Sequence, residues 1–178
     1  MSRRTRIKFC GLTRARDLHG ALALDIDLIG FVFAASSPRR LELVAARDLR
    51  AQVPDHITTV ALVMDNPAQE IDAIVEIVKP DLLQFHGRET DAFCAGFGRP
   101  FVKALAMAGR SADEVAGLVA QWPVASMVLF DGHGAGEMGG SGKVFDWDIL
   151  PAHCDKPFLL AGGLHPDNVA AAIGRARP

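Results

Sequence analysis

The sequence has few cysteines, little net charge and no long apolar run. Its three cysteines are an odd number without a Cys-x-x-Cys pair, so we expect free thiols rather than a disulfide framework or a zinc knuckle. A formal net charge of -2 gives no basic field that would attract a nucleic acid or an acidic membrane. No apolar run reaches the roughly 18 residues that cross a bilayer, and the first residues lack a signal-peptide apolar region. We therefore expect a cytoplasmic protein that binds small molecules, with neither nucleic acid nor membrane as a partner.

The sequence does contain enough apolar residues for a sizeable core. It has 178 residues, of which 49% are hydrophobic, and this favours one domain over residues 1–178. Short runs rich in branched and aromatic residues recur along the chain and are typical of strands. The seven predicted strands are Arg6–Cys10, Leu28–Phe33, Thr59–Met64, Leu82–Phe85, Phe101–Leu105, Met127–Phe130 and Phe158–Ala161.

Segments with helical periodicity lie between these runs. Apolar residues within 67–78 repeat at i, i+3, i+4 and i+7, and we expect Asn66 to cap this helix with Pro67 at its first position. A capping box at Ser111–Glu114 predicts the start of a second helix, and residues 168–177 form a third candidate. Strand and helix thus alternate along the chain.

This alternation predicts an α/β protein with a parallel sheet. Seven units fit a (β/α)8 TIM barrel better than an open doubly wound sheet, although the open sheet stays possible. A complete barrel usually needs at least about 200 residues. We therefore expect the eighth β/α unit to be missing from this chain, so that the sequence ends early or a partner covers an open side.

Reactive groups in such barrels lie at the carboxyl ends of the strands. Lys8 and Cys10 end the first strand and share one face because side chains alternate along a strand. An ammonium group beside a thiol favours the thiolate, which can act as a base. The alternative for Cys10 is a small buried apolar residue.

Asp131 ends the sixth strand and precedes a glycine. A carboxyl group there can act as a general acid if a partly apolar site raises its pKa. Its alternative role is to cap a loop. As catalysts, Cys10 and Asp131 would face each other across the mouth of the barrel.

Other strand ends carry candidate binding residues. Gln84 and His86 share a face at the end of the fourth strand, where a structural histidine is the alternative. Arg39 follows the second strand and could clamp a carboxylate, unless it is only part of an exposed basic loop. Gly162 and Gly163 end the seventh strand, where the loops of this fold usually bind phosphate.

The segment after Asp131 is rich in glycine. Its Gly134–Gly139 stretch fits the dinucleotide fingerprint only weakly, because no helix opens after it. Gly142-Lys143 fails the Walker pattern. We expect a mobile loop that closes over the site.

Six motifs together resemble one known family, phosphoribosylanthranilate isomerase of tryptophan biosynthesis. The resemblance runs in order from Ile7 to the end of the chain. The motifs are Lys8-Phe-Cys-Gly-Leu-Thr13, Gly30-Phe-Val-Phe33, Ser37-Pro-Arg39, Leu83-Gln-Phe-His-Gly87, Gly139-Gly-Ser-Gly-Lys143 with Phe145-Asp-Trp147, and Leu160-Ala-Gly-Gly-Leu164 with Pro166-Asp-Asn-Val169.

The resemblance implies an isomerase of the aldose-ketose, intramolecular-oxidoreductase type. Its reaction is an Amadori rearrangement of N-(5-phosphoribosyl)anthranilate, with no metal and no organic cofactor. Carried over from the family, Cys10 is the general base, Asp131 the general acid, Arg39 the contact of the anthranilate carboxylate, and Gly162 and Gly163 the phosphate-binding glycines. We further expect Lys8, Gln84 and His86 to bind the substrate, and the protein to be a monomer or homodimer.

Two alternatives stay open. Family members usually continue past Arg177-Pro178 into an eighth strand with a phosphate loop, so this chain could be an inactive or weakly active barrel that binds a sugar phosphate or a partner chain. The other alternative is an indole-glycerol-phosphate synthase, for which only Lys8, Lys103 and Glu137 lie in suggestive places. We expect Lys103 to be a core-facing or ion-paired structural residue.

Overall fold

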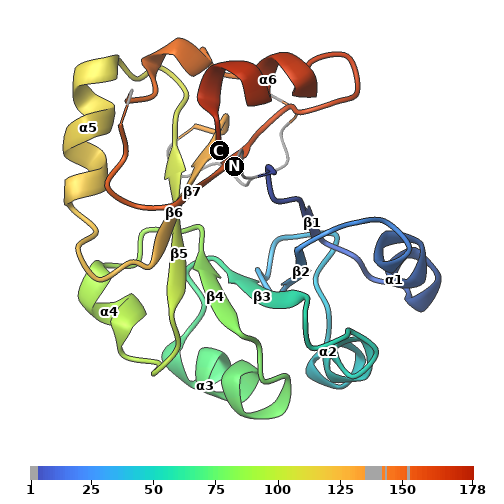
Figure 1. Ribbon diagram of the computed structural model, residues 1–178. Coiled ribbons are helices and arrows are strands. Elements are labelled where there is room, and N and C mark those ends of the chain that lie inside the picture. Colours follow the sequence, from blue (N-terminus) through green and yellow to red (C-terminus); the bar gives the residue numbers. More distant parts are fainter. Residues whose placement is uncertain (1–3, 135–141, 143, 152) are drawn as a thin grey trace.

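The computed structural model describes residues 4–134, 142, 144–151 and 153–178, and it is an α/β fold (Figure 1). One sheet of seven strands, all parallel, follows the chain order from β1 to β7. The strands are β1 (Lys8–Cys10), β2 (Leu28–Val32), β3 (Thr58–Val63), β4 (Leu82–Phe85), β5 (Phe101–Ala106), β6 (Met127–Asp131) and β7 (Phe158–Ala161). All seven predicted strands are confirmed, with ends that differ by at most two residues.

Helices connect successive strands and lie around the outside of the sheet (Figure 1). They are α1 (Ala15–Leu22), α2 (Leu43–Arg50), α3 (Ala68–Ile77), α4 (Asp91–Ala95), α5 (Ala112–Ala120), the 3-10 helix η1 (Trp147–Ile149) and α6 (Val169–Ala176). The three predicted helices correspond to α3, α5 and α6. The seven parallel strands and the helices outside them form a half-barrel.

Side chains alternate between the two faces of the sheet, so each face carries its own part of the hydrophobic core. One face carries Val102, Ala104, Met127 and Leu129, which pack together inside the curve of the sheet. The opposite face packs against the helices, in one cluster that runs from Leu18 to Ala125 and another that spans Leu105 to Ala172. Because both faces of the central strands are buried, nearly every strand residue is apolar. A polar side chain on the inner face therefore stands out as functional.

The two predicted helix starts have different outcomes. The capping box of α5 is present, since Glu114 Oε2 accepts from the backbone nitrogen of Ser111 at 2.8 Å. The prediction for Asn66 is wrong, because Pro67 occupies the cap position of α3. The Asn66 amide instead accepts from Met64 and donates to the Phe33 carbonyl. It joins the loop after β3 to β2, a long-range role that sequence spacing does not reveal.

Strands β1 and β7 form the two edges of this sheet, each paired on one side only among the described residues. On the opposite face of β1 from Lys8, Ile7 and Phe9 are 44% and 37% exposed. The outer face of β1 is thus only partly covered. No helix within the described ranges is long and apolar enough to cross a membrane.

Candidate active site

Cys10 and Lys8 lie side by side on the inner face of β1. Their positions are shown by Gly30, the residue that pairs with Cys10 on β2. A Cβ atom added to Gly30 would lie 2.7 Å from Cys10 Sγ and 3.1 Å from Lys8 Nζ. The thiol and the ammonium group therefore both occupy the space over Gly30, as the alternation along β1 predicts. Cys10 is free and only partly buried, so a ligand can reach its sulfur.

The lack of a side chain at Gly30 leads to a prediction. Gly30→Ala pushes Cys10 Sγ out of place, so we expect kcat to fall roughly 10- to 100-fold and the free energy of unfolding to fall by about 1–3 kcal/mol. Gly20→Ala is the matched control, because nothing lies within 4 Å of its new Cβ in α1. It should stabilise the helix by about 0.5–1 kcal/mol and leave turnover unchanged. Steady-state kinetics measure turnover, and urea unfolding measures stability. Equal turnover in both variants would contradict the placement of Cys10.

Arg39 reaches the same corner of the sheet from the loop after β2. Its Nη1 donates to the Cys10 carbonyl at 3.2 Å, and its side chain lies across Gly11. Gly11 has a φ of 83°, and a Cβ there would collide with the guanidinium group, so both the backbone and the contact favour glycine. The guanidinium group remains exposed at the mouth, where it can meet a carboxylate.

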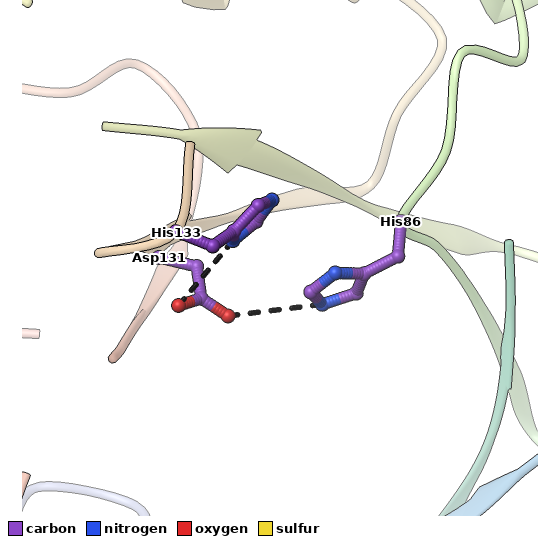
Figure 2. A group of neighbouring side chains, drawn as sticks. All are labelled: His86, Asp131 and His133. Atoms are coloured by element: carbon purple, nitrogen blue, oxygen red, sulfur yellow. Dashed lines mark ion pairs between the residues drawn. The ribbon is translucent and has the colours of Figure 1, made fainter. Parts of the chain in front are cut away.

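Asp131 lies in a buried group with two histidines, His86 and His133 (Figure 2). Asp131 Oδ1 is 3.4 Å from His133 Nδ1, and Asp131 Oδ2 is 3.9 Å from His86 Nε2. The two imidazole rings stack with centroids 5.2 Å apart. Asp131, His86 and His133 are respectively 5%, 8% and 2% exposed. The carboxylate at the end of β6 thus contacts both imidazoles.

The electrostatics of this group correct one prediction. Burial is the largest influence and raises the pKa of Asp131, but the contact with His133 and the charges of both histidines outweigh it. The pKa of Asp131 therefore lies below its ordinary value of 3.8, and the expected rise is wrong. For His86, burial outweighs the attraction of Asp131 and lowers the pKa to about 4, so its imidazole is neutral near pH 7.

The depressed pKa of His86 makes stability depend on pH. Its ordinary value is 6.5, so between pH 6.5 and 4 the unfolded chain binds a proton that the folded chain excludes. We expect the free energy of unfolding to fall by roughly 3 kcal/mol across this window. His86→Gln should remove most of that fall in urea titrations at pH 7, 5.5 and 4.5. An equal fall in both proteins would contradict the assignment.

His86, Asp131 and His133 are residue types that also bind transition metals. One ligand atom from each lies within 4.8 Å of the others. In a tetrahedral zinc site with bonds of about 2.0–2.1 Å, neighbouring ligand atoms lie about 3.3 Å apart. The group is wider than that, so its spacing fits two imidazole–carboxylate contacts better than the shell of one ion.

The remaining predicted binding residues lie near these groups. Gln84 is 1% exposed and its Oε1 has no hydrogen-bond partner among the described residues. Gly162 has a φ of 90°, and a Cβ there would lie 2.8 Å from Asp131 Oδ1, so the loop after β7 passes directly beside Asp131. The Gly163 carbonyl accepts from the Asn168 amide at 2.9 Å, which ties this loop to the start of α6.

Lys103 has the structural role that we expected from the sequence. Its Nζ donates to the Gly87 carbonyl at 2.6 Å and to Glu89 Oε2 at 2.9 Å, and it lies 4.7 Å from the centre of the Trp122 ring. The side chains of Lys103 and Glu89 are only 4% and 3% exposed. Glu89 Oε1 in turn accepts from the Asp65 backbone at 2.8 Å. The pair fastens the loop after β4, next to His86.

Removing the charge of Lys103 should be costly for folding. Lys103→Met leaves the Glu89 carboxylate buried without its partner, so we expect a loss of about 3–5 kcal/mol in the free energy of unfolding. Adding Glu89→Gln to this variant should restore part of that loss. Urea unfolding of both variants tests this, and a double variant less stable than the single one would contradict a buried ion pair.

Sequence reasoning missed His133. The alternation of side chains, continued two residues past Asp131, would have put His133 on the inner face. The strand ends at Asp131, however, and Gly132 follows it, so nothing in the sequence indicated that the alternation continues. The predicted mobile loop, with Glu137, Gly139 and Lys143, lies outside the described residues. A cavity of about 470 Å³ beside Gly132 is lined by residues from the β5 loop and from 144–149, and none of the eight predicted site residues lines it.

The parallel sheet and the polar side chains at its carboxyl end define a β/α-barrel class of enzyme. Comparison with known proteins gives the family. A family model for N-(5'-phosphoribosyl)anthranilate isomerase matches residues 7–178. The N-(5'-phosphoribosyl)anthranilate isomerase of Stenotrophomonas maltophilia is 45% identical over 170 residues, covering 96% of this chain and 78% of its own.

Solved structures agree with this result. The phosphoribosyl anthranilate isomerases of Thermus thermophilus and Thermotoga maritima match with TM-scores of 0.83 and 0.86 at 29% and 27% identity. Each match covers 98% of this chain, and 84% and 85% of the solved chains. The chain therefore belongs to the N-(5'-phosphoribosyl)anthranilate isomerase family, as the six motifs predicted.

Proposed function

We propose that this chain converts N-(5-phosphoribosyl)anthranilate to 1-(2-carboxyphenylamino)-1-deoxyribulose 5-phosphate in tryptophan biosynthesis. The observation that carries this proposal is the placement of Cys10 and Asp131. Cys10 lies at the carboxyl end of β1 and Asp131 at the carboxyl end of β6. These two strands are not neighbours in the sheet. A substrate between them can meet an acid on one side and a base on the other.

Ring opening begins at Asp131 in this mechanism. The histidines lower the pKa of Asp131 in the free chain, so the mechanism requires its carboxyl group to take up a proton when the anionic substrate binds. That group then gives the proton to the furanose ring oxygen as the C1′–O bond breaks, and the anthranilate nitrogen becomes part of an iminium ion. The iminium acidifies the proton on C2′, and the Cys10 thiolate removes it to form an enolamine. The enolamine gains a proton at C1′ and loses the one on the C2′ hydroxyl to become the ketone. The substrate acts as its own electron sink, so these steps use no cofactor.

Other residues hold the two ends of the substrate. Arg39, exposed beside Cys10, would clamp the anthranilate carboxylate. Gly162 and Gly163 would offer backbone N–H groups to the phosphate, and Gly162 lies next to Asp131. Lys8, Gln84 and His86 face the same interior, and the influence of the Lys8 charge on the pKa of His86 is consistent with that.

The assay is the loss of phosphoribosylanthranilate fluorescence with the purified chain. Turnover supports the isomerase. The chain spans about four-fifths of the length of the relatives that it matches, so the assay also separates a non-catalytic barrel, which would bind a product analogue without turnover. We further propose one domain over residues 1–178 built on the family's TIM-type barrel, a monomeric or homodimeric state, and a cytoplasmic location.

A further inference from the structure

The interior of the sheet holds a cation to which the proposed mechanism gives no step, and our inference rests on that mechanism. Lys8 lies on the inner face of β1 and is partly buried, on the side of the sheet where β5 and β6 carry an apolar cluster. Among the described residues, no hydrogen bond or ion pair holds its ammonium group. Lys103, in contrast, has the Glu89 carboxylate as its partner. Because a cation partly removed from water without a partner is costly, a ligand is the natural source of the missing partner.

Gly30 brings the Lys8 ammonium group next to the atom that takes the C2′ proton. A Cβ added at Gly30 would lie 3.1 Å from Lys8 Nζ and 2.7 Å from Cys10 Sγ, so the nitrogen and the sulfur border the same small space. In the proposed reaction, Cys10 removes the hydrogen of C2′, and that carbon also carries a hydroxyl group. When the hydrogen meets Sγ, the hydroxyl oxygen is therefore within reach of Nζ.

Gln84 supplies a hydrogen-bond acceptor in the same interior. It follows Leu82 by two residues on β4, and Leu82 packs on the inner apolar cluster, so the Gln84 side chain also points inward. Its Oε1 is buried and has no hydrogen-bond partner among the described residues. β4 and β2 are alternate strands, and alternate strands fill the same layers inside a barrel of this type. Gln84 and the space over Gly30 thus share one part of the interior.

We propose that Lys8 is a further catalytic residue, which together with Gln84 binds the C2′ hydroxyl group of the substrate and turns the C2′ hydrogen toward Cys10. A hydroxyl oxygen accepts from an ammonium group, and its hydrogen is donated to an amide oxygen. Both protein atoms then gain the partner that each lacks in the free chain. Once the enolamine has become the ketone, the oxygen still accepts from Lys8 but has no hydrogen left for Gln84. The proposal adds no bond-breaking step to the mechanism.

The test measures the binding of two reduced product analogues that differ only in the C2′ hydroxyl group. We expect the wild-type chain to bind the hydroxyl analogue about 10- to 100-fold more tightly than the 2′-deoxy analogue, as for a hydrogen bond to a charged group. In Lys8→Met this preference should largely disappear, because methionine is of similar length but carries no charge. Lys79→Met is the matched control, since Lys79 is exposed and precedes β4 at the amino end of the sheet. It should keep the wild-type preference.

Turnover and stability give two further readouts. Lys8→Met should lower kcat about 10- to 100-fold, the cost of a misplaced reacting group. Gln84→Met should lower kcat by less and should also weaken the preference for the hydroxyl analogue. Because Gln84 Oε1 has no partner in the free chain, this variant should keep or raise the urea midpoint of unfolding. A lower midpoint with an unchanged preference would assign Gln84 a structural role and overturn the proposal.

The analogue pair also separates this proposal from other roles of Lys8. A wild-type preference in folded Lys8→Met overturns the proposal, and so does an equal loss of affinity for both analogues, because Lys8 would then act on Cys10 or on packing. Absence of any preference in the wild type overturns it as well. In these cases an active wild type and an inactive Asp131→Ala keep the proposed function. No turnover by the wild type would refute that function and this proposal with it.

Discussion

Asp131→Ala is expected to lower kcat at least 100-fold. The carboxyl group lies beside Gly162 at the end of β6, so its loss removes the proton that opens the furanose ring. Removal of a general acid typically costs 10²- to 10⁴-fold. KM should change little, because we expect Arg39, Gly162 and Gly163 to bind the substrate. Steady-state kinetics by substrate fluorescence measure both constants.

Asp131→Asn serves as the isosteric control for this experiment. It keeps the size of the side chain in a site where Asp131 is 5% exposed, so the protein should remain folded while kcat falls as far as in the alanine variant. A kcat within tenfold of wild type in both variants would refute the role of Asp131 as the acid. A large change in melting temperature with unchanged kcat would instead assign it a structural role.

Cys10→Ala is expected to cause a second loss of at least 100-fold in kcat. The thiol is partly exposed over Gly30, beside the Lys8 ammonium group, and alanine cannot take the proton from C2′. Because Cys10 acts after ring opening, the variant should still open the sugar. Exchange of the C2′ proton with deuterated water should therefore be lost, and this is followed by mass spectrometry of the recovered substrate and product.

The other two cysteines supply the controls. Cys154→Ser should retain wild-type turnover, since Cys154 packs beside α5 and η1 away from the sheet interior. Cys94 is fully buried and burial raises the pKa of its thiol to about 12, so it should resist alkylation. Iodoacetamide should then inactivate the enzyme through Cys10. Inactivation that persists at an equal rate in Cys10→Ala would contradict this assignment.

The strand ends could be predicted from sequence because they follow local rules. A period of two placed Lys8 with Cys10 on the inner face, and buried apolar runs gave all seven strands. The alternation of side chains applies only within a strand, and β6 ends at Asp131. His133, which follows Gly132, was therefore missed.

Long-range contacts account for the errors. Burial raises the pKa of Asp131, and the contact with His133 outweighs that rise with help from the charge of His86. His86 follows β4, and no local pattern encodes that neighbour. Asn66 was assigned to a helix cap because its sequence suits one, yet it bonds to the Phe33 carbonyl. Lys103 was correctly placed in the core, but Glu89 as its partner follows only from the folded loop after β4.

The most direct test is a crystal structure of this chain with a reduced analogue of the product. The account predicts that Cys10 Sγ and the Asp131 carboxyl group approach the sugar from opposite sides of C1′ and C2′. Each should lie within about 2.6–3.2 Å of its reacting atom or reach it through one water. An analogue bound elsewhere, or either side chain turned away from the sugar with no other acid or base in its place, would contradict the account.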